Sequence, residues 1–241
     1  MTGYLDRLSG DLRRDPPEPT RGFAEVLAAG PSVAVIAEVK RASPSQGTIA
    51  ADADPAAAAA GYQTGGAACV SVLCTERDFG GSLDDLSRAR RAISIPVLAK
   101  DFTLFPEQVA AQRLAGADAI LVILAMVSDD EAKRLIETAA LLGMDTLIET
   151  HDRPQLGRAI AIGAGVIGVN ARDLNSLDVD RDRQLELLAL VPDGVLRVAE
   201  SGIESRADVE RARDAGADAV LVGSALMRSP RLLADLVGVA R

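Results

Sequence analysis

The chain has 241 residues, 48% of them hydrophobic and 25% charged, which is the composition of a protein that folds around a core and suits one large α/β domain. Its formal net charge of −9 argues against non-specific nucleic-acid binding, which needs a basic face. No stretch approaches the ~18 uninterrupted apolar residues of a membrane helix, and the N-terminus lacks a signal-peptide core. We therefore expect a cytoplasmic protein that binds neither nucleic acid nor membrane.

Cysteine and histidine are scarce. Cys69 and Cys74 are the only cysteines, too few for a disulfide framework, and we expect reduced thiols in or beside a strand. The single histidine, His151, excludes a His-rich metal site, so acid–base chemistry should fall to Lys, Asp and Glu. We expect His151 itself to be dispensable and no metal to be bound.

In chain order, the first predicted element is a partly helical extension over residues 1–30. Pro16, Pro17 and Pro19 interrupt it, and it should lie across the bottom or rim of the fold. Eight short apolar runs follow, near 33–39, 68–73, 96–99, 118–124, 145–149, 165–169, 196–200 and 218–223. They lack polar alternation, which is typical of parallel strands covered on both faces.

Segments with helical periodicity, such as 129–142 and 205–215, separate these runs. The sequence also repeats itself: AGADAILV at 115–122 returns as AGADAVLV at 215–222, each a helix end stopped by glycine before a strand. Eight strand–helix units without a long insert predict one (β/α)₈ TIM barrel domain, with its barrel at 33–241. A Rossmann fold is disfavoured, because no Gly-x-Gly-x-x-Gly follows the first strand.

Charged residues stand at the ends of several predicted strands, where the active sites of such barrels lie. Glu38 and Lys40 are two residues apart and share one strand face. Lys100, Glu149 and Asn170 end three further strands. The alternative for Glu38 and Lys40 is a structural ion pair at the rim.

Two further features concern ligand binding. Gly202, Gly223 and Ser224 follow the last two strands, where this fold usually binds phosphate, although tight turns alone would also explain the glycines. Phe79 and Phe102 follow the second and third strands, and either could wall an aromatic substrate ring or pack in the core.

Together these motifs resemble the signature of the indole-3-glycerol phosphate synthase family. The matching segments cover most of the chain from residue 33 onward: IAEVKRASPS at 36–45, DFGGS at 78–82, KDF at 100–102, LIE at 147–149, GVNARDL at 168–174, AESGI at 199–203 and VGSALM at 222–227. The resemblance implies ring closure, decarboxylation and dehydration of 1-(2-carboxyphenylamino)-1-deoxyribulose 5-phosphate to indole-3-glycerol phosphate in tryptophan biosynthesis. It implies no cofactor, and we expect a monomer or weak homodimer.

The resemblance also assigns roles to individual residues. Lys100 would be the general acid at the ketone and Glu149 the general base of the dehydration. Lys40 would hold the substrate carboxylate, with Glu38 paired to it. The remaining assignments are Asn170, Arg172 and Ser201 for substrate contacts, Phe79, Phe102 and Leu174 for the anthranilate ring, and Ser43, Gly202, Gly223 and Ser224 for phosphate. In the family the segment before the first strand closes over the site, but here it is short and contains prolines.

Two alternatives remain. A phosphoribosylanthranilate isomerase-like barrel would have a similar phosphate site, but it would be expected to carry a cysteine where this chain has Glu38 and Lys40. A non-catalytic barrel that binds a phosphorylated metabolite would have no need of Lys100 and Glu149.

Overall fold

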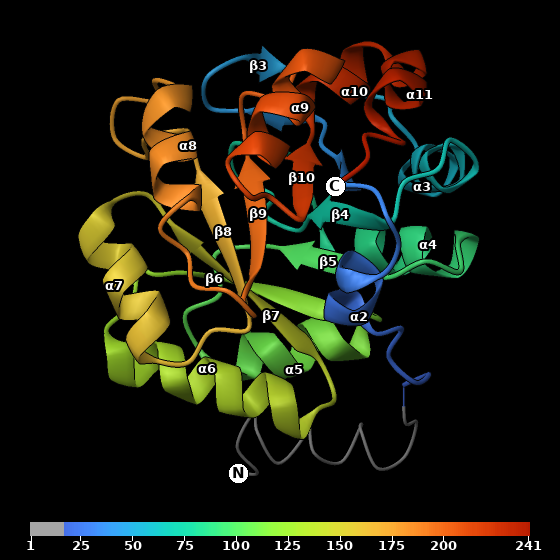
Figure 1. Cartoon of the computed structure of the whole chain (residues 1–241). Helices are drawn as coiled ribbons and strands as arrows, with labels where there is room; N and C mark the ends of the chain where they lie inside the picture. The colour runs from blue at the N-terminus through green and yellow to red at the C-terminus, as the bar shows by residue number, and fades with distance from the viewer. Residues whose placement is uncertain (1–16) are drawn as a thin grey trace, which may run out of the picture.

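The structure, a computed structural model, describes residues 17–241 and forms a closed barrel of eight parallel strands surrounded by helices (Figure 1). The part of the predicted extension at 1–16 lies outside the described residues. The barrel strands are β1 (Ala34–Val39), β4 (Cys69–Leu73), β5 (Val97–Lys100), β6 (Ala119–Ile123), β7 (Asp145–Thr150), β8 (Val166–Asn170), β9 (Leu196–Glu200) and β10 (Ala219–Val222). β1 pairs with both β4 and β10, which closes the ring.

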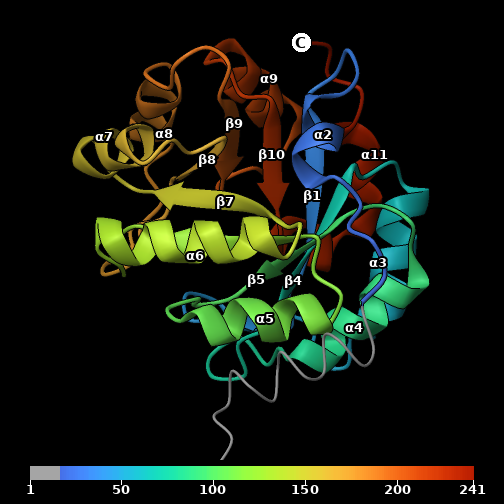
Figure 2. The ribbon, with the colours of Figure 1, turned by 90° about the horizontal axis from the view of Figure 1, so that it is seen from below.

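The main helices connect successive strands and cover the outside of the barrel (Figure 2). They are α3 (Pro55–Thr64), α4 (Leu83–Ala92), α5 (Pro106–Leu114), α6 (Asp129–Leu141), α7 (Arg153–Ala161), α8 (Arg181–Leu188) and α9 (Arg206–Asp214), followed by the short α10 (Ser224–Arg228), the 3₁₀ turn η1 (Pro230–Leu232) and α11 (Leu233–Leu236). Several begin at a Ser or Asp whose side chain accepts a backbone N–H, as Ser128 does for α6. No helix within residues 17–241 is both long and apolar enough to cross a membrane.

Side chains alternate between two apolar layers along each strand. On β1, Val35, Ala37 and Val39 pack outward against the helices, whereas Ala34 and Ile36 belong to a second cluster inside the barrel. The inward series of each strand therefore continues in phase to its C-terminal end. This alternation decides which polar residues reach the mouth.

The predicted (β/α)₈ architecture and the eight strands are confirmed, each strand lying within about two residues of its predicted run. A small antiparallel pair, β2 (Ala42–Ser43) with β3 (Gly47–Thr48), was not predicted. It lies in the loop after β1. Cys69 and Cys74 are free, buried thiols in and beside β4, as expected.

Helix α2 (Phe23–Ala28) closes the N-terminal end of the barrel. Phe23 and Leu27 are fully buried and pack in the inner cluster. The backbone N–H of Ala24 donates to Oδ2 of Asp145, the first residue of β7, at 2.9 Å. The described part of the extension thus lies at the bottom of the barrel.

Candidate active site

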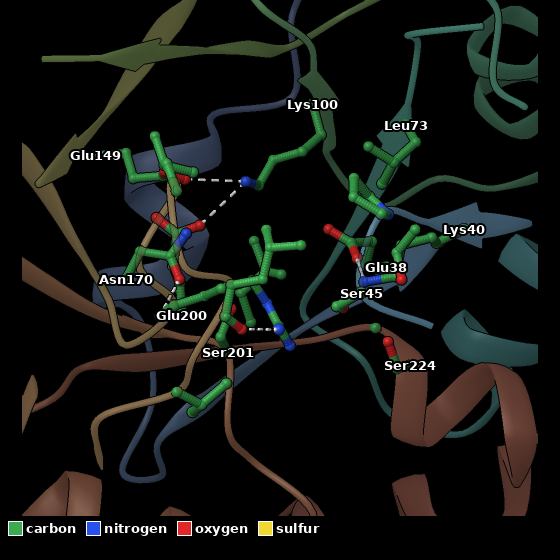
Figure 3. Close-up of a pocket in the computed structure, with 18 of the residues that line it drawn as sticks. Glu38, Lys40, Ser45, Leu73, Lys100, Glu149, Asn170, Glu200, Ser201 and Ser224 are labelled. Carbon is green, nitrogen blue, oxygen red and sulfur yellow. Dashed lines mark hydrogen bonds and ion pairs between the residues drawn. The ribbon is translucent and has the colours of Figure 1, made fainter. Parts of the chain in front are cut away.

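A cleft of about 890 Å³ opens at the C-terminal ends of the strands (Figure 3). Every residue that the sequence nominated for the site lines it: Glu38, Lys40, Ser43, Phe79, Lys100, Phe102, Glu149, Asn170, Arg172, Leu174, Ser201, Gly202, Gly223 and Ser224. These residues come from separate strand ends and loops, so the closed barrel is what brings them together.

Lys100 lies between two buried carboxylates. Its Nζ is 3.0 Å from Oε2 of Glu149 and 3.3 Å from Oε2 of Glu200. Both glutamate side chains are 1% exposed and that of Lys100 is 14% exposed. Lys100 and Glu200 end β5 and β9, and Glu149 is the last residue but one of β7. Each is in phase with the inward apolar residues below it.

The pKa values of the three groups are strongly linked. Burial alone would lower the pKa of Lys100, but Glu149, Glu200 and Glu38 outweigh burial and raise it. Burial alone would raise the pKa of Glu149, but Lys100 and His151 reverse this and lower it. Burial, together with the nearby Glu149, raises the pKa of Glu200 to about 8 in spite of Lys100. These directions favour an ammonium on Lys100, a carboxylate on Glu149 and a proton on Glu200.

A second ion pair lies on the β1 side of the cleft. Lys40 Nζ is 2.7 Å from Oε1 of Glu38, the pairing that the family resemblance implied. A Cβ at Gly223 would lie only 2.2 Å from that carboxylate oxygen and 3.0 Å from Lys40 Nζ. The absence of a side chain at residue 223 thus leaves room for the ion pair between Glu38 and Lys40.

The side chain of Glu200 likewise requires a glycine, at a position in β8. A Cβ at Gly168 would lie 2.0 Å from Oε1 of Glu200. The carboxylate therefore lies directly over the β8 backbone, held toward Lys100.

The loop after β8 is held by the residues that the sequence assigned to substrate. The Asn170 side-chain oxygen accepts from the backbone N–H of Arg172 at 3.0 Å, and Arg172 Nη1 donates to the carbonyl of Leu177 at 2.7 Å. At the end of the neighbouring strand β9, Ser201 has a φ of 67° in the left-handed region. A non-glycine residue in this conformation is strained, which is common at functional sites.

An apolar wall faces the charged groups. The rings of Phe79 and Phe102 meet edge to face with centroids 6.1 Å apart, and both line the cleft with Leu174. The site thus combines apolar side chains with two lysines, an arrangement suited to an aromatic anion.

Sequence comparison agrees with this geometry. The sequence model described as "Indole-3-glycerol phosphate synthase" matches residues 5–236. The chain belongs to the indole-3-glycerol phosphate synthase family. An indole-3-glycerol phosphate synthase from Beutenbergia cavernae is 50% identical over 220 residues, covering 90% of this chain and 82% of that protein. One from Mycolicibacterium vanbaalenii is 50% identical over 236 residues, covering 97% and 86%.

Solved structures support the fold alone. A thiamine phosphate pyrophosphorylase from Pyrococcus furiosus superposes with a TM-score of 0.63 at 13% identity, covering 85% of this chain and 93% of that one. An N-acetylmannosamine-6-phosphate 2-epimerase from Clostridium perfringens gives 0.66 at 14% identity, covering 87% and 92%. Both are therefore similar barrels, and neither informs the chemistry of this family member.

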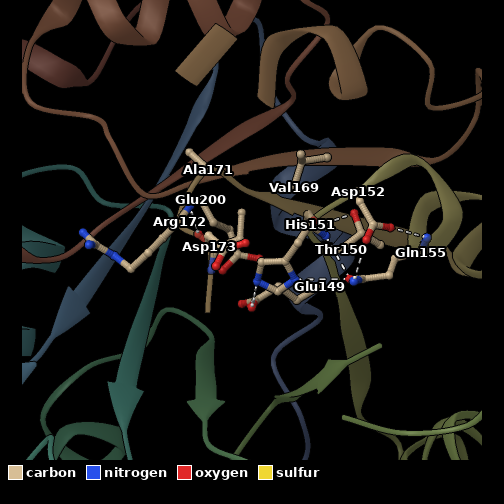
Figure 4. Close-up of polar contacts among 12 residues, drawn as sticks. Glu149, Thr150, His151, Asp152, Gln155, Val169, Ala171, Arg172, Asp173 and Glu200 are labelled. Carbon is tan, nitrogen blue, oxygen red and sulfur yellow. Dashed lines mark hydrogen bonds and ion pairs between the residues drawn. The ribbon is translucent and has the colours of Figure 1, made fainter. Parts of the chain in front are cut away.

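Two residues of this synthase-family site were missed by sequence reasoning. Glu200 was quoted in a motif but given no role, although it is in phase with the inward Val198. His151 was expected to be dispensable, yet its Nε2 lies 3.2 Å from Oε1 of Glu149 (Figure 4). The signal was the two-residue spacing from Glu149, which puts both side chains on one face of the chain.

Only part of the segment before the first strand lies within the described residues. Its described part, with α2, lies at the end of the barrel opposite the cleft and cannot close over it. Residues 1–16 lie outside the described part of the chain. Within residues 17–241 no group of three His, Cys, Asp or Glu residues is arranged to hold a metal ion.

Proposed function

We propose that the chain converts 1-(2-carboxyphenylamino)-1-deoxyribulose 5-phosphate to indole-3-glycerol phosphate, carbon dioxide and water, as a carboxy-lyase of tryptophan biosynthesis. The observation that carries this proposal is Lys100, held between two buried carboxylates in a cleft that Phe79 and Phe102 also line. The enzyme is cytoplasmic and acts as a monomer or weak homodimer.

In this proposal Lys100 acts on the ketone. Its ammonium hydrogen-bonds to the carbonyl oxygen and donates a proton as the ring carbon bearing the carboxylate attacks the carbonyl carbon. A carbon–carbon bond forms, and the carbonyl becomes a hydroxyl. Negative charge develops on that oxygen only during attack, so the interaction favours the transition state.

Decarboxylation and dehydration follow. Loss of carbon dioxide returns the electron pair to the ring and restores its aromaticity. Glu149 then takes a proton from the carbon that joins the nitrogen to the hydroxyl-bearing carbon. Lys100, which has regained a proton from water, protonates the hydroxyl, which leaves as water as the indole double bond forms. The lowered pKa of Glu149 keeps it ionised and able to accept its proton. These steps need placed acids, bases and charges and no cofactor.

The other residues bind the substrate. Lys40 holds the carboxylate before it is lost, with Glu38 as its partner. Asn170, Arg172 and Ser201 contact the polar chain, while Phe79, Phe102 and Leu174 enclose the ring. Phosphate is bound at the rim by Ser43, Gly202, Gly223 and Ser224. The Ser43 hydroxyl supports this, because it is buried at the cleft with no hydrogen-bond partner among residues 17–241.

An activity assay tests the function. Purified protein is incubated with the carboxyphenylamino-deoxyribulose phosphate, and indole fluorescence is followed. We expect product to form. A parallel reaction with phosphoribosylanthranilate should show no isomerisation, and the reverse result in the two reactions would overturn the proposal in favour of the isomerase.

Two lysine variants test the division of roles. Lys100→Met should lower kcat by about 10²-fold or more, the scale of a positioned acid, with little change in substrate binding. Lys40→Met should weaken substrate binding, because its carboxylate partner is charged before the reaction begins. Single-turnover rates combined with direct binding separate the effects. Near-normal kcat in Lys100→Met and none in Lys40→Met would reverse the assignment.

A further inference from the structure

The orientation of the His151 ring is fixed by its neighbours (Figure 4). Gln155 Nε2 donates to Oδ2 of Asp152 at 3.1 Å, which turns the amide oxygen of Gln155 toward the histidine. That oxygen accepts the backbone N–H of His151 at 3.0 Å and lies 3.2 Å from its Nδ1. An amide oxygen can only accept, so Nδ1 must carry a hydrogen.

The other ring nitrogen then faces the proposed base. Nε2 lies 3.2 Å from Oε1 of Glu149, and the His151 side chain is 7% exposed. The contact is an ion-pair distance and not an aligned hydrogen bond, because Nε2 has no hydrogen-bond partner within residues 17–241. A bare Nε2 lone pair this close to a carboxylate would be repulsive, which favours a proton on one of the two groups. The pair is therefore either imidazolium with carboxylate or neutral imidazole with carboxylic acid.

The contact with His151 gives the two buried carboxylates, Glu149 and Glu200, different basic neighbours. Lys100 is within 3.0 Å of Glu149 and 3.3 Å of Glu200, nearly the same distance from each. Only Glu149 has a second cationic partner, His151. Within residues 17–241 neither oxygen of Glu200 meets a hydrogen-bond donor other than the nearby Lys100.

We propose that His151 is a positioning residue that decides which of the two carboxylates is the base. Its imidazolium lies beside Oε1 of Glu149, which keeps Glu149 ionised and leaves the remaining proton of the two carboxylates on Glu200. Oε2 of Glu149 accepts from Lys100 Nζ at 3.0 Å, so each oxygen of the proposed base has its own basic neighbour. This assignment rests on the proposed function for Glu149 as a base.

The charges around the ring agree with this state. Burial alone would lower the pKa of His151, but the close approach of Glu149 and its charge, with Gln155, outweigh both burial and the repulsion of Lys100 and raise it. The charged groups near the ring are Glu149 on β7, Lys100 on β5 and, beyond Gln155, Asp152 at the start of α7. An ionised Glu149 thus favours a charged ring.

The chain's single histidine makes a direct measurement possible. Untagged protein labelled with ¹⁵N-histidine gives imidazole signals from this ring alone, with no substrate present. We expect both nitrogens protonated at pH 7, and a neutral ring with hydrogen only on Nδ1 in the Glu149→Gln variant. A neutral ring in the wild type would place the proton on Glu149 and overturn the proposal, and so would a charged ring in both proteins.

Kinetics test the consequence for the base. In His151→Leu, Glu149 loses its imidazolium neighbour and burial should raise its pKa, so the acid limb of the kcat–pH profile should move up by about one unit or more. His151→Gln, which can keep a neutral donor near Oε1, should show a smaller shift. A loss of kcat by the same factor at every pH, with an unmoved limb, would mean a structural role only. Failure of the wild type to form product would refute the function but leave the ring's protonation state measurable.

Discussion

Gly168 illustrates how a single residue position can be required by a side chain from another strand. It sits in β8, but the Glu200 carboxylate of β9 occupies the space where its Cβ would be. Gly165, three residues earlier, has nothing within 4 Å of such an atom and an ordinary φ. The two glycines are therefore close in sequence but under different constraints.

This contrast gives a matched pair of substitutions. Gly168→Ala should displace Glu200 from Lys100 and lower kcat by about tenfold or more, the small end of the range for acid–base groups. Gly165→Ala should leave kcat unchanged. Steady-state kinetics on both proteins, with circular dichroism to confirm folding, make the comparison. Equal kcat values in the two variants would show that the position of Glu200 does not matter.

At the level of residues, the sequence predicted most of the side chains that reach the cleft but not the contacts between side chains of different strands. Lys100 and Glu149 could be placed because each ends an apolar run. The contact of Lys100 with Glu200 depends on the positions of three different strands around the barrel, which no local pattern encodes. The contact between Gly223 and Glu38 is equally non-local: a side chain at residue 223 would strike the Glu38 carboxylate on β1.

Among the elements, the barrel strands were predictable and the small pieces were not. Parallel strands covered on both faces leave continuous apolar runs bounded by glycine turns. The β2–β3 pair has only two residues in each strand, too few to leave a periodic signal. The extension was expected at the bottom or the rim of the barrel. In its described part, helix α2 covers the bottom.

The contribution of α2 can be tested by measuring the stability of the protein. Phe23 is fully buried in the inner cluster, so Phe23→Ala should lower the free energy of unfolding by about 3–5 kcal/mol. Activity per folded molecule should be unchanged, because the cleft is at the other end. Phe105→Ala is the control, since Phe105 is 61% exposed and the change should stay within about 0.5 kcal/mol. Urea unfolding measures both, and equal effects would mean that α2 contributes little.

For the whole molecule, the buried carboxylates couple catalysis to stability. The chain carries a net charge of −9, yet its cleft concentrates Lys40 and Lys100 where an anionic substrate would enter. Glu200 is held in a place where ionisation is unfavourable, and the pKa of about 8 records this. At alkaline pH the ionisation of Glu200 should therefore lower the free energy of unfolding.

The sign of that effect can be derived from the two states of Glu200. Its pKa rises from 4.5 in the unfolded chain to about 8 in the fold, so the folded protein binds more protons between these values. The stabilisation is complete below pH 4.5 and is lost as the pH rises toward 8. Glu200→Gln keeps the shape of the protonated acid but cannot ionise, so it should escape this loss.

We therefore expect Glu200→Gln to be nearly as stable as the wild type at pH 5 and more stable at pH 8, by on the order of 1 kcal/mol or more. Urea unfolding at both pH values gives the difference. Glu204→Gln is a suitable control, because that carboxylate is 59% exposed and water screens it. If the advantage of Glu200→Gln were the same at pH 5 and pH 8, Glu200 would already be ionised in the folded protein at the lower pH. The proton that His151 is proposed to leave on it would then have to reside elsewhere.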